Sequence, residues 1–170
     1  MTSTTGAGIA TGTYTIDTAA SRIGFTTAHM FGLGPVAGTF AIRSGTVTLA
    51  DDPAKCTVTA RIDAASFTTD KPRRDKDIRS KRFLHAERYP DLVFESDRLV
   101  RDGDRWLLHG RLTVHGLTAP VTLEVHSGTA EPDGCRFRAR ARIDRYAHHV
   151  GPRGIVGRYL NAEFDIVGRS

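Results

Sequence analysis

Residues 135–144 read CRFRARARID and alternate strictly between apolar and polar side chains. Every second residue, from Cys135 to Ile143, is apolar or small, and the residues between them are four arginines, with Asp144 at the end. Because successive side chains of a β-strand point to opposite faces, this stretch predicts a strand with one apolar face and one cationic face. A chain made mostly of such strands is expected to close its sheet into a barrel or a sandwich.

The same alternation recurs in shorter runs along most of the chain. Such runs cover residues 23–27, 36–43, 46–50, 56–62, 92–100, 106–114, 121–125 and 162–166. Glycine-containing segments separate several of them, and we expect turns at Ser44-Gly45, 101–104 and 115–118. The pattern therefore predicts an all-β fold whose apolar strand faces share one interior.

Residues 70–89 break this pattern, since they lack a period of two and are rich in charge. The pairs Asp75/Arg79 and Asp77/Lys81 have the i,i+4 spacing that supports a short exposed helix. The apolar anchors expected for this helix are Ile78, Phe83 and Leu84. A short helix between strands is expected to cover one open end of a barrel, and the glycine-rich loops 29–35 and 148–157 are expected at its rims.

Length and composition predict one globular domain of residues 13–170, preceded by a flexible Ser/Thr/Gly-rich tail of residues 1–12. The formal net charge of +5 favours anionic ligands or surfaces. The chain shows neither the pattern of a signal peptide nor a membrane-spanning apolar run, so we expect a cytoplasmic protein. Cys56 and Cys135 lack the spacing of a zinc site and are expected to be buried thiols, while the sequence leaves open whether they lie close together.

Several short motifs stand in a characteristic order along the chain. They are Asp17 with SRIGF at 21–25 and His29-Met30, GTF at 38–40, RDKDIRSKRFL at 74–84, Tyr89-Pro90 with Phe94-x-Ser96, and GRLTVHGLTAPVTL at 110–123. In order and spacing these motifs resemble the YceI-like family, known as lipocalin-like polyisoprenoid-binding proteins. The resemblance covers residues 13–168.

This resemblance implies an all-β fold, an eight-stranded antiparallel lipocalin-like barrel with a short helix near one end. It also implies the binding, carriage or sequestration of a long isoprenoid lipid, of the polyprenyl phosphate or isoprenoid quinone type, in an apolar barrel cavity. No cofactor, metal or catalytic residue is expected. The chain departs from the family pattern at Ala20, where the family often has His, at Ala147, where it often has Gly, and in lacking the export signal of many members.

Apolar contacts alone can hold a prenyl chain, because burial of an alkyl chain is worth about 0.8 kcal/mol per CH₂. The residues expected to line the cavity are Phe25, Met30, Phe31, Phe40, Phe83, Leu84, Phe94, Leu112, Val114 and Ile155. A phosphate or quinone head group would also need hydrogen-bond donors at one end of the tunnel. The candidates for the head group are His29, Arg74, Arg79, Lys81 and Arg153, and we expect His29 with Arg74 and Arg79 to mark the polar mouth.

A basic small barrel that binds nucleic acid is the first alternative, based on the arginines of residues 135–144. The aromatic residues lie mostly on the expected inner faces, which argues against base stacking. Glu124, Glu163 and Asp165 on other strands are expected to pair with the arginines. We therefore expect no nucleic-acid partner, although the same arginines suggest a transient contact with an anionic membrane surface.

A metal-dependent enzyme on the same barrel is the second alternative, since His29 and the His148-His149 pair could meet a carboxylate. Their spacing is unspecific, and the sequence contains no nucleophile elbow, zinc-protease, P-loop or dinucleotide-binding motif. We therefore expect an isoprenoid lipid as the partner and no enzyme activity. Whether two copies form a homodimer is left open by the sequence.

Overall fold

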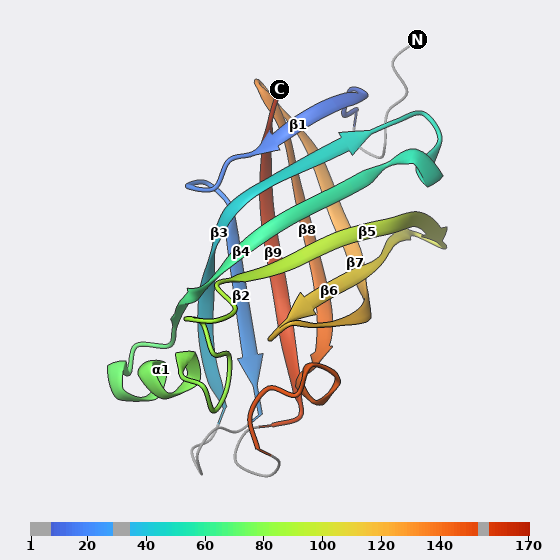
Figure 1. Ribbon diagram of the computed structural model, residues 1–170. Helices are drawn as coiled ribbons and strands as arrows, with labels where there is room; N and C mark the ends of the chain where they lie inside the picture. The colour runs from blue at the N-terminus through green and yellow to red at the C-terminus, as the bar shows by residue number, and fades with distance from the viewer. Residues whose placement is uncertain (1–7, 29–34, 153–156) are drawn as a thin grey trace.

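A computed structural model describes residues 8–28, 35–152 and 157–170, which form one antiparallel sheet of nine strands with a short α-helix (Figure 1). The strands are β1 (Gly12–Ile16), β2 (Arg22–Thr27), β3 (Val36–Leu49), β4 (Thr57–Thr68), β5 (Asp91–Asp102), β6 (Arg105–Val114), β7 (Leu117–Glu131), β8 (Gly134–Asp144) and β9 (Tyr159–Arg169). The helices are η1 (Pro53–Lys55), α1 (Pro72–Arg79) and η2 (Arg145–His148), of which η1 and η2 are 3₁₀-helices.

The sheet closes on itself because β3 pairs with β4 as well as with β2. β2 pairs with the first part of β3 and of β9, and β1 pairs with the last residues of the same two strands. β1 and β2 therefore share one position, and the ring has eight. This confirms the predicted eight-stranded antiparallel barrel.

The alternation of β8 is confirmed on both faces. Cys135 and Ala139 are buried in the interior, while the arginines between them point outward and meet acidic residues of neighbouring strands. Arg140 pairs with Glu124 at 2.9 Å. Arg136 and Arg138 approach the carboxylate of Asp165 at 3.6 and 3.8 Å, which is too long for hydrogen bonds, so these two contacts are purely electrostatic.

The turn predicted at Ser44-Gly45 is wrong, because both residues belong to the continuous strand β3. A Cβ atom on Gly45 would lie 2.4 Å from Ile16 Cδ1 and 2.8 Å from the carbonyl oxygen of Thr59. The glycine therefore permits a close approach of three strands instead of a chain reversal. β3 bends at two register shifts, between Thr39 and Ala41 and between Ile42 and Ser44.

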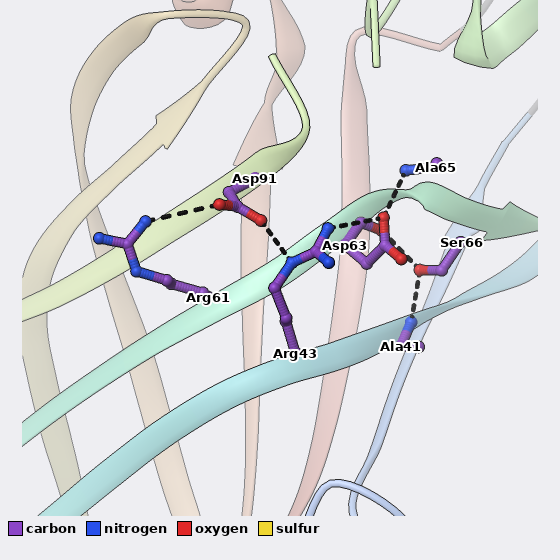
Figure 2. Close-up of polar contacts among 7 residues, drawn as sticks. All are labelled: Ala41, Arg43, Arg61, Asp63, Ala65, Ser66 and Asp91. Carbon is purple, nitrogen blue, oxygen red and sulfur yellow. Dashed lines mark hydrogen bonds and ion pairs between the residues drawn. The ribbon is translucent and has the colours of Figure 1, made fainter. Parts of the chain in front are cut away.

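An ion-pair network on the outer face holds β3, β4 and β5 together at this bend (Figure 2). Arg43 contacts Asp63 at 3.2 Å and Asp91 at 2.7 Å, and Arg61 reaches the second oxygen of Asp91 at 3.5 Å. The backbone N–H of Ala41 donates to the hydroxyl of Ser66 at 2.7 Å, which satisfies a donor at the irregular register.

The helix is shorter than predicted. α1 covers Pro72–Arg79, so Phe83 and Leu84 lie in the turns that follow it. Asp75 does not pair with Arg79 on an exposed face but is 3 % exposed and accepts hydrogen bonds from Thr69. Arg79 instead donates to the backbone carbonyl of Phe67. The i,i+4 pattern failed here because both side chains point toward β4 and not along the helix surface.

The predicted tail of residues 1–12 lies partly outside the described residues, which begin at Gly8. Ile9 is 1 % exposed and belongs to the hydrophobic core, and the hydroxyl of Tyr14 donates to the carbonyl of Ala10 at 2.6 Å. The chain therefore already packs against the barrel three residues before β1 begins.

Replacing Asp75 with Asn should lower the free energy of unfolding by about 1–3 kcal/mol near neutral pH, because it removes a charged, buried acceptor. Burial opposes ionisation of Asp75, but hydrogen bonds from Thr69 and Thr68 and the charge of Arg79 outweigh it and lower the pKa of this carboxyl. The ionised carboxyl therefore stabilises the fold above the unfolded-state pKa of about 3.9, and this contribution is lost as the pH falls through the folded-state pKa.

Urea unfolding followed by circular dichroism, at neutral pH and below about pH 4, measures this difference. The gap between wild type and Asp75→Asn should shrink at the lower pH, whereas Asp77→Asn on the same helix should behave like wild type at both. A gap that is the same at the two pH values would contradict the role assigned to Asp75.

Candidate functional site

The inward faces of the strands enclose an apolar cavity of about 290 Å³ that is partly open to solvent. Its wall runs around the ring and includes Ile62 on β4, Phe94 on β5, Leu108 on β6 and Phe137 on β8. The volume is about twice that of a cavity of roughly 150 Å³ that holds one benzene ring, so it can hold about a dozen carbon atoms. The barrel interior is therefore hollow over part of its length.

β7 shows this hollow most clearly, because none of its fifteen residues is fully buried. Val121, Leu123 and Val125 point inward, line the cavity and are only partly buried. In a barrel filled by interlocking side chains these inward positions would be buried. They are instead exposed to the empty space in front of them.

Polar wall residues gather at the end of the barrel away from α1. They are Thr48 near the end of β3, Thr57 at the start of β4, Asp104 in the β5–β6 turn, and His126 and Ser127 on β7. A register shift between Val125 and Ser127 inserts His126 as an extra residue in β7. This bulge turns polar side chains toward the end of the barrel, where the inward faces of the strands are no longer apolar. We call these five polar wall residues the polar rim.

Figure 1 places α1 at one end of the barrel, and the interior at that end is filled by buried side chains. The ring of Phe25 lies 5.6 Å from that of Phe40 and 5.1 Å from that of Phe67, with 5.4 Å between the last two. Phe83, at 1 % exposure, and Ile78 of α1 are buried in the same core. We call Phe25, Phe40, Phe67 and Phe83 the aromatic plug, and it limits how deep a ligand can reach.

The structure separates the residues predicted to line the cavity into three groups. Phe94 and Leu112 belong to the cavity wall. Phe25, Phe40 and Phe83 belong to the aromatic plug, and Leu84 and Val114 are buried core residues outside the wall. Met30, Phe31 and Ile155 lie outside the described residues. A ligand contact for any of these residues stays a prediction.

The residues predicted to bind a head group lie away from the cavity wall or outside the described ranges. Arg74 donates to the hydroxyl of Thr69 at 2.8 and 3.0 Å, and Arg79 donates to the carbonyl of Phe67. Lys81 is exposed, and none of these three residues lines the cavity. His29 and Arg153 lie outside the described residues. Their role at a polar mouth therefore stays a prediction.

Sequence reasoning missed the rim residues, although one signal was present. The apolar alternation of Val121, Leu123 and Val125 stops at His126-Ser127-Gly128 in mid-strand, which is how a bulge appears in sequence. Thr48, Thr57 and Asp104 gave no such signal, because threonine is common on outer strand faces and aspartate in turns.

The described residues give no support to a metal site. Nowhere in residues 8–28, 35–152 and 157–170 do three or more His, Cys, Asp or Glu side chains gather as a metal site would require. His148 is buried with its Nε2 2.9 Å from the carbonyl oxygen of Leu112, while the neighbouring His149 is exposed. Within the same ranges, none of the helices has the length and apolar character needed to span a bilayer.

Both cysteines are buried and unpaired. Cys56 is part of the cavity wall, where its thiol accepts a hydrogen bond from the backbone N–H of Ala50 at 3.3 Å. Burial raises the pKa of the Cys135 thiol, which keeps that thiol in its neutral, unreactive form. Neither environment is that of an activated nucleophile.

Comparison with known proteins places this barrel among relatives of similar shape. A family model described as the YceI-like domain matches residues 14–167. Protein YceI of Escherichia coli O157:H7 is 41% identical over 88 residues, which are 51% of this chain and 46% of the relative. The chain spans about half the length of the curated relatives it matches.

Two solved structures share the fold over nearly the whole chain. The crystal structure of Burkholderia cenocepacia BcnA has a TM-score of 0.76 and 25% sequence identity, and the match covers 89% of this chain and 98% of BcnA. A structure described as a polyisoprenoid binding domain from Saccharophagus degradans, implicated in plant cell wall breakdown, has a TM-score of 0.66 at 14% identity. That match covers 92% of this chain and 98% of the domain and shows likeness of fold.

The hollow and filled parts of the barrel should respond differently to the same truncation. We expect Leu84→Ala, in the filled core, to lower the free energy of unfolding by about 3 kcal/mol, because a new cavity is left behind. Leu123→Ala, at the wall of the existing cavity, should cost about 1 kcal/mol, because Leu123 already has few partners on its inner side. Equal losses in urea unfolding would show that the interior is packed uniformly.

Proposed function

The chain belongs to the YceI-like domain family, and on this premise we propose that it binds an isoprenoid lipid in the barrel cavity. The observation that carries the proposal is the apolar space inside the ring, lined by inward residues of all nine strands and left unfilled by the side chains of the described residues. The description of the Saccharophagus degradans domain as polyisoprenoid binding supports an isoprenoid over other apolar ligands.

The energetics of the cavity suit a hydrocarbon chain. About a dozen buried carbons at about 0.8 kcal/mol each supply roughly 10 kcal/mol. Association costs take back at least about 4 kcal/mol, which leaves at most about 6 kcal/mol, a dissociation constant of roughly tens of micromolar or weaker. The cavity wall needs no polar contact along the chain to reach this affinity.

The outer face offers little to the nucleic-acid alternative. Arg105 and Arg140 both contact Glu124, at 3.0 and 2.9 Å, and Arg142 stacks on Tyr159 with its guanidinium carbon 4.2 Å from the ring centre. Arg105 and Arg140 are thus paired with a carboxylate of the same face and Arg142 is held against an aromatic ring, which supports lipid binding over nucleic-acid recognition as the function that we propose. Transient membrane contact, a homodimer and a cytoplasmic location stay predictions from the sequence.

Protein purified under mild conditions should carry a lipid that native mass spectrometry detects and that organic extraction identifies. After delipidation, radiolabelled farnesol should bind in equilibrium dialysis. Ala60→Phe should weaken this binding by about tenfold or more, because Ala60 is a partly buried wall residue and the ring would occupy the chain's space.

Thr59→Phe is the matched control, since Thr59 is exposed on the same strand and should leave the affinity for farnesol unchanged. Circular dichroism verifies that both variants keep the strand signal, and Leu123→Trp provides a second way to fill the cavity if Ala60→Phe does not fold. Farnesol affinity that is unaffected by a folded cavity-filling variant would refute binding inside the barrel.

A further inference from the structure

Strand pairing in the barrel wall ends on one side, near the polar end of the cavity. Pairing between β4 and β5 ends at Thr59 and Glu95, and beyond this point β5 pairs only with β6. The backbone N–H of Val58 donates to the hydroxyl of Ser96 at 2.7 Å instead of to a backbone carbonyl. The outer part of the β5–β6 hairpin therefore no longer pairs with β4, and β5 contacts the 3₁₀-helix η1, which precedes β4, so the wall lacks strand pairing on this side at the end away from α1.

The place where the hairpin departs carries two matched irregularities. A register shift lies between Ser96 and Arg98 on β5, and Gly110 stands opposite Ser96 on β6. A Cβ atom on Gly110 would lie 2.7 Å from both the carbonyl oxygen of Glu95 and the ring of Phe94. The bulge and the glycine together let the hairpin turn outward without breaking its pairing.

The opposite end offers no comparable entry among the described residues. The aromatic plug fills the interior near α1, and Phe67 and Phe83 are 3 % and 1 % exposed. A flexible apolar chain that enters the cavity at the polar rim, which we call the mouth, would therefore advance until it meets these rings. A polar head group would remain behind at the rim.

The chemistry of the rim selects the kind of head group. Thr48, Thr57, Ser127 and His126 offer hydroxyl and imidazole groups that can donate or accept hydrogen bonds. Asp104 contributes a carboxylate, and the wall residues that the structure describes include neither Lys nor Arg. A phosphate placed here would meet the like charge of Asp104, while the cation beside Trp106, Arg101, lies over the indole ring at 5.6 Å and already donates its Nε–H to the carbonyl of Gly103. An uncharged oxygen-bearing group would find hydrogen-bond partners without that repulsion.

We propose that the ligand enters tail first through the mouth beside the β5–β6 hairpin, and that an uncharged head group, such as a quinone ring or an alcohol, rests at this rim next to Trp106. The proposal rests on the proposed function, since it assigns the orientation and the head-group class of the same ligand. It places the head group at the end of the barrel opposite to Arg74 and Arg79.

Trp106 is the single tryptophan of the chain and lines the cavity near the β5–β6 turn, so its fluorescence reports on the rim. Quinone rings quench tryptophan efficiently only at short range. Decylubiquinone should therefore quench most of the wild-type emission. In the double variant Trp106→Phe with Phe94→Trp, the reporter sits deeper in the wall, and the same ligand at saturation should quench it clearly less.

Equilibrium dialysis of the same samples measures ligand binding independently of ligand orientation. Absence of decylubiquinone binding would remove the proposed function itself. Binding with stronger quenching of the deep reporter than of Trp106 would leave the proposed function intact and overturn the orientation. If the double variant does not fold, Leu112→Trp combined with Trp106→Phe places a reporter at another wall residue below the rim.

The head-group class is tested with farnesol and farnesyl phosphate, which differ only in charge at the head. Wild type should prefer farnesol, and Asp104→Lys should shift the ratio of the two affinities toward the phosphate by about tenfold or more. Asp133→Lys makes the same charge change in the exposed β7–β8 turn, outside the cavity wall, and should leave the ratio near the wild-type value. A wild-type preference for the phosphate, or equal shifts in both variants, would overturn the assignment of the rim.

Discussion

The hydrogen-bonded closure of the sheet is the constraint on which the rest of the structure depends. β3 completes the ring by pairing with β2 and β1 along one edge and with β4 along the other. A closed ring of eight positions sets the diameter of the interior, and the side chains that point inward must then fill that space or leave it empty. The proposed binding of a lipid follows from how the inward side chains of this chain fill the ring at one end and leave it open at the other.

That volume is divided unevenly between the two ends of the barrel. Near α1 the rings of Phe25, Phe40 and Phe67 in the aromatic plug contact one another, and buried Asp75 joins the helix to the end of β4 through Thr68 and Thr69. Toward the other end the cavity wall consists mainly of isoleucine, leucine and valine, and it leaves an open space inside the ring. The filled end supplies a packed core, and the hollow end supplies the space in which we propose that a ligand binds.

Charge is arranged on the outside of the same strands and has a different role. Arg43 with Asp63 and Asp91 holds three strands at the bend of β3, and Arg140 with Glu124 links β8 to β7. Exposed pairs of this kind contribute little stability each, but they satisfy the outward charges within the protein's own surface. The ligand recognition that we propose is therefore assigned to the interior, where the cavity wall is apolar and its polar side chains lie at one end.

The period of two and the turn residues determined from sequence that the chain is all-β and closes into a barrel or sandwich, because strand alternation and turn chemistry are local properties. The number of eight strands came from the order of the motifs, through the family resemblance. Predictions from local spacing were wrong where residues distant in sequence supply the contacts instead. Ser44-Gly45 became strand because three strands approach at Gly45, and Asp75 turned to Thr69 instead of Arg79 because the helix packs on β4. Only the tertiary structure decided which apolar residues fill the interior and which line a cavity. Phe25 and Phe94 both lie on apolar strand faces, yet one belongs to the plug and the other to the cavity wall, since that depends on register, bulges and the volumes of residues far away in sequence.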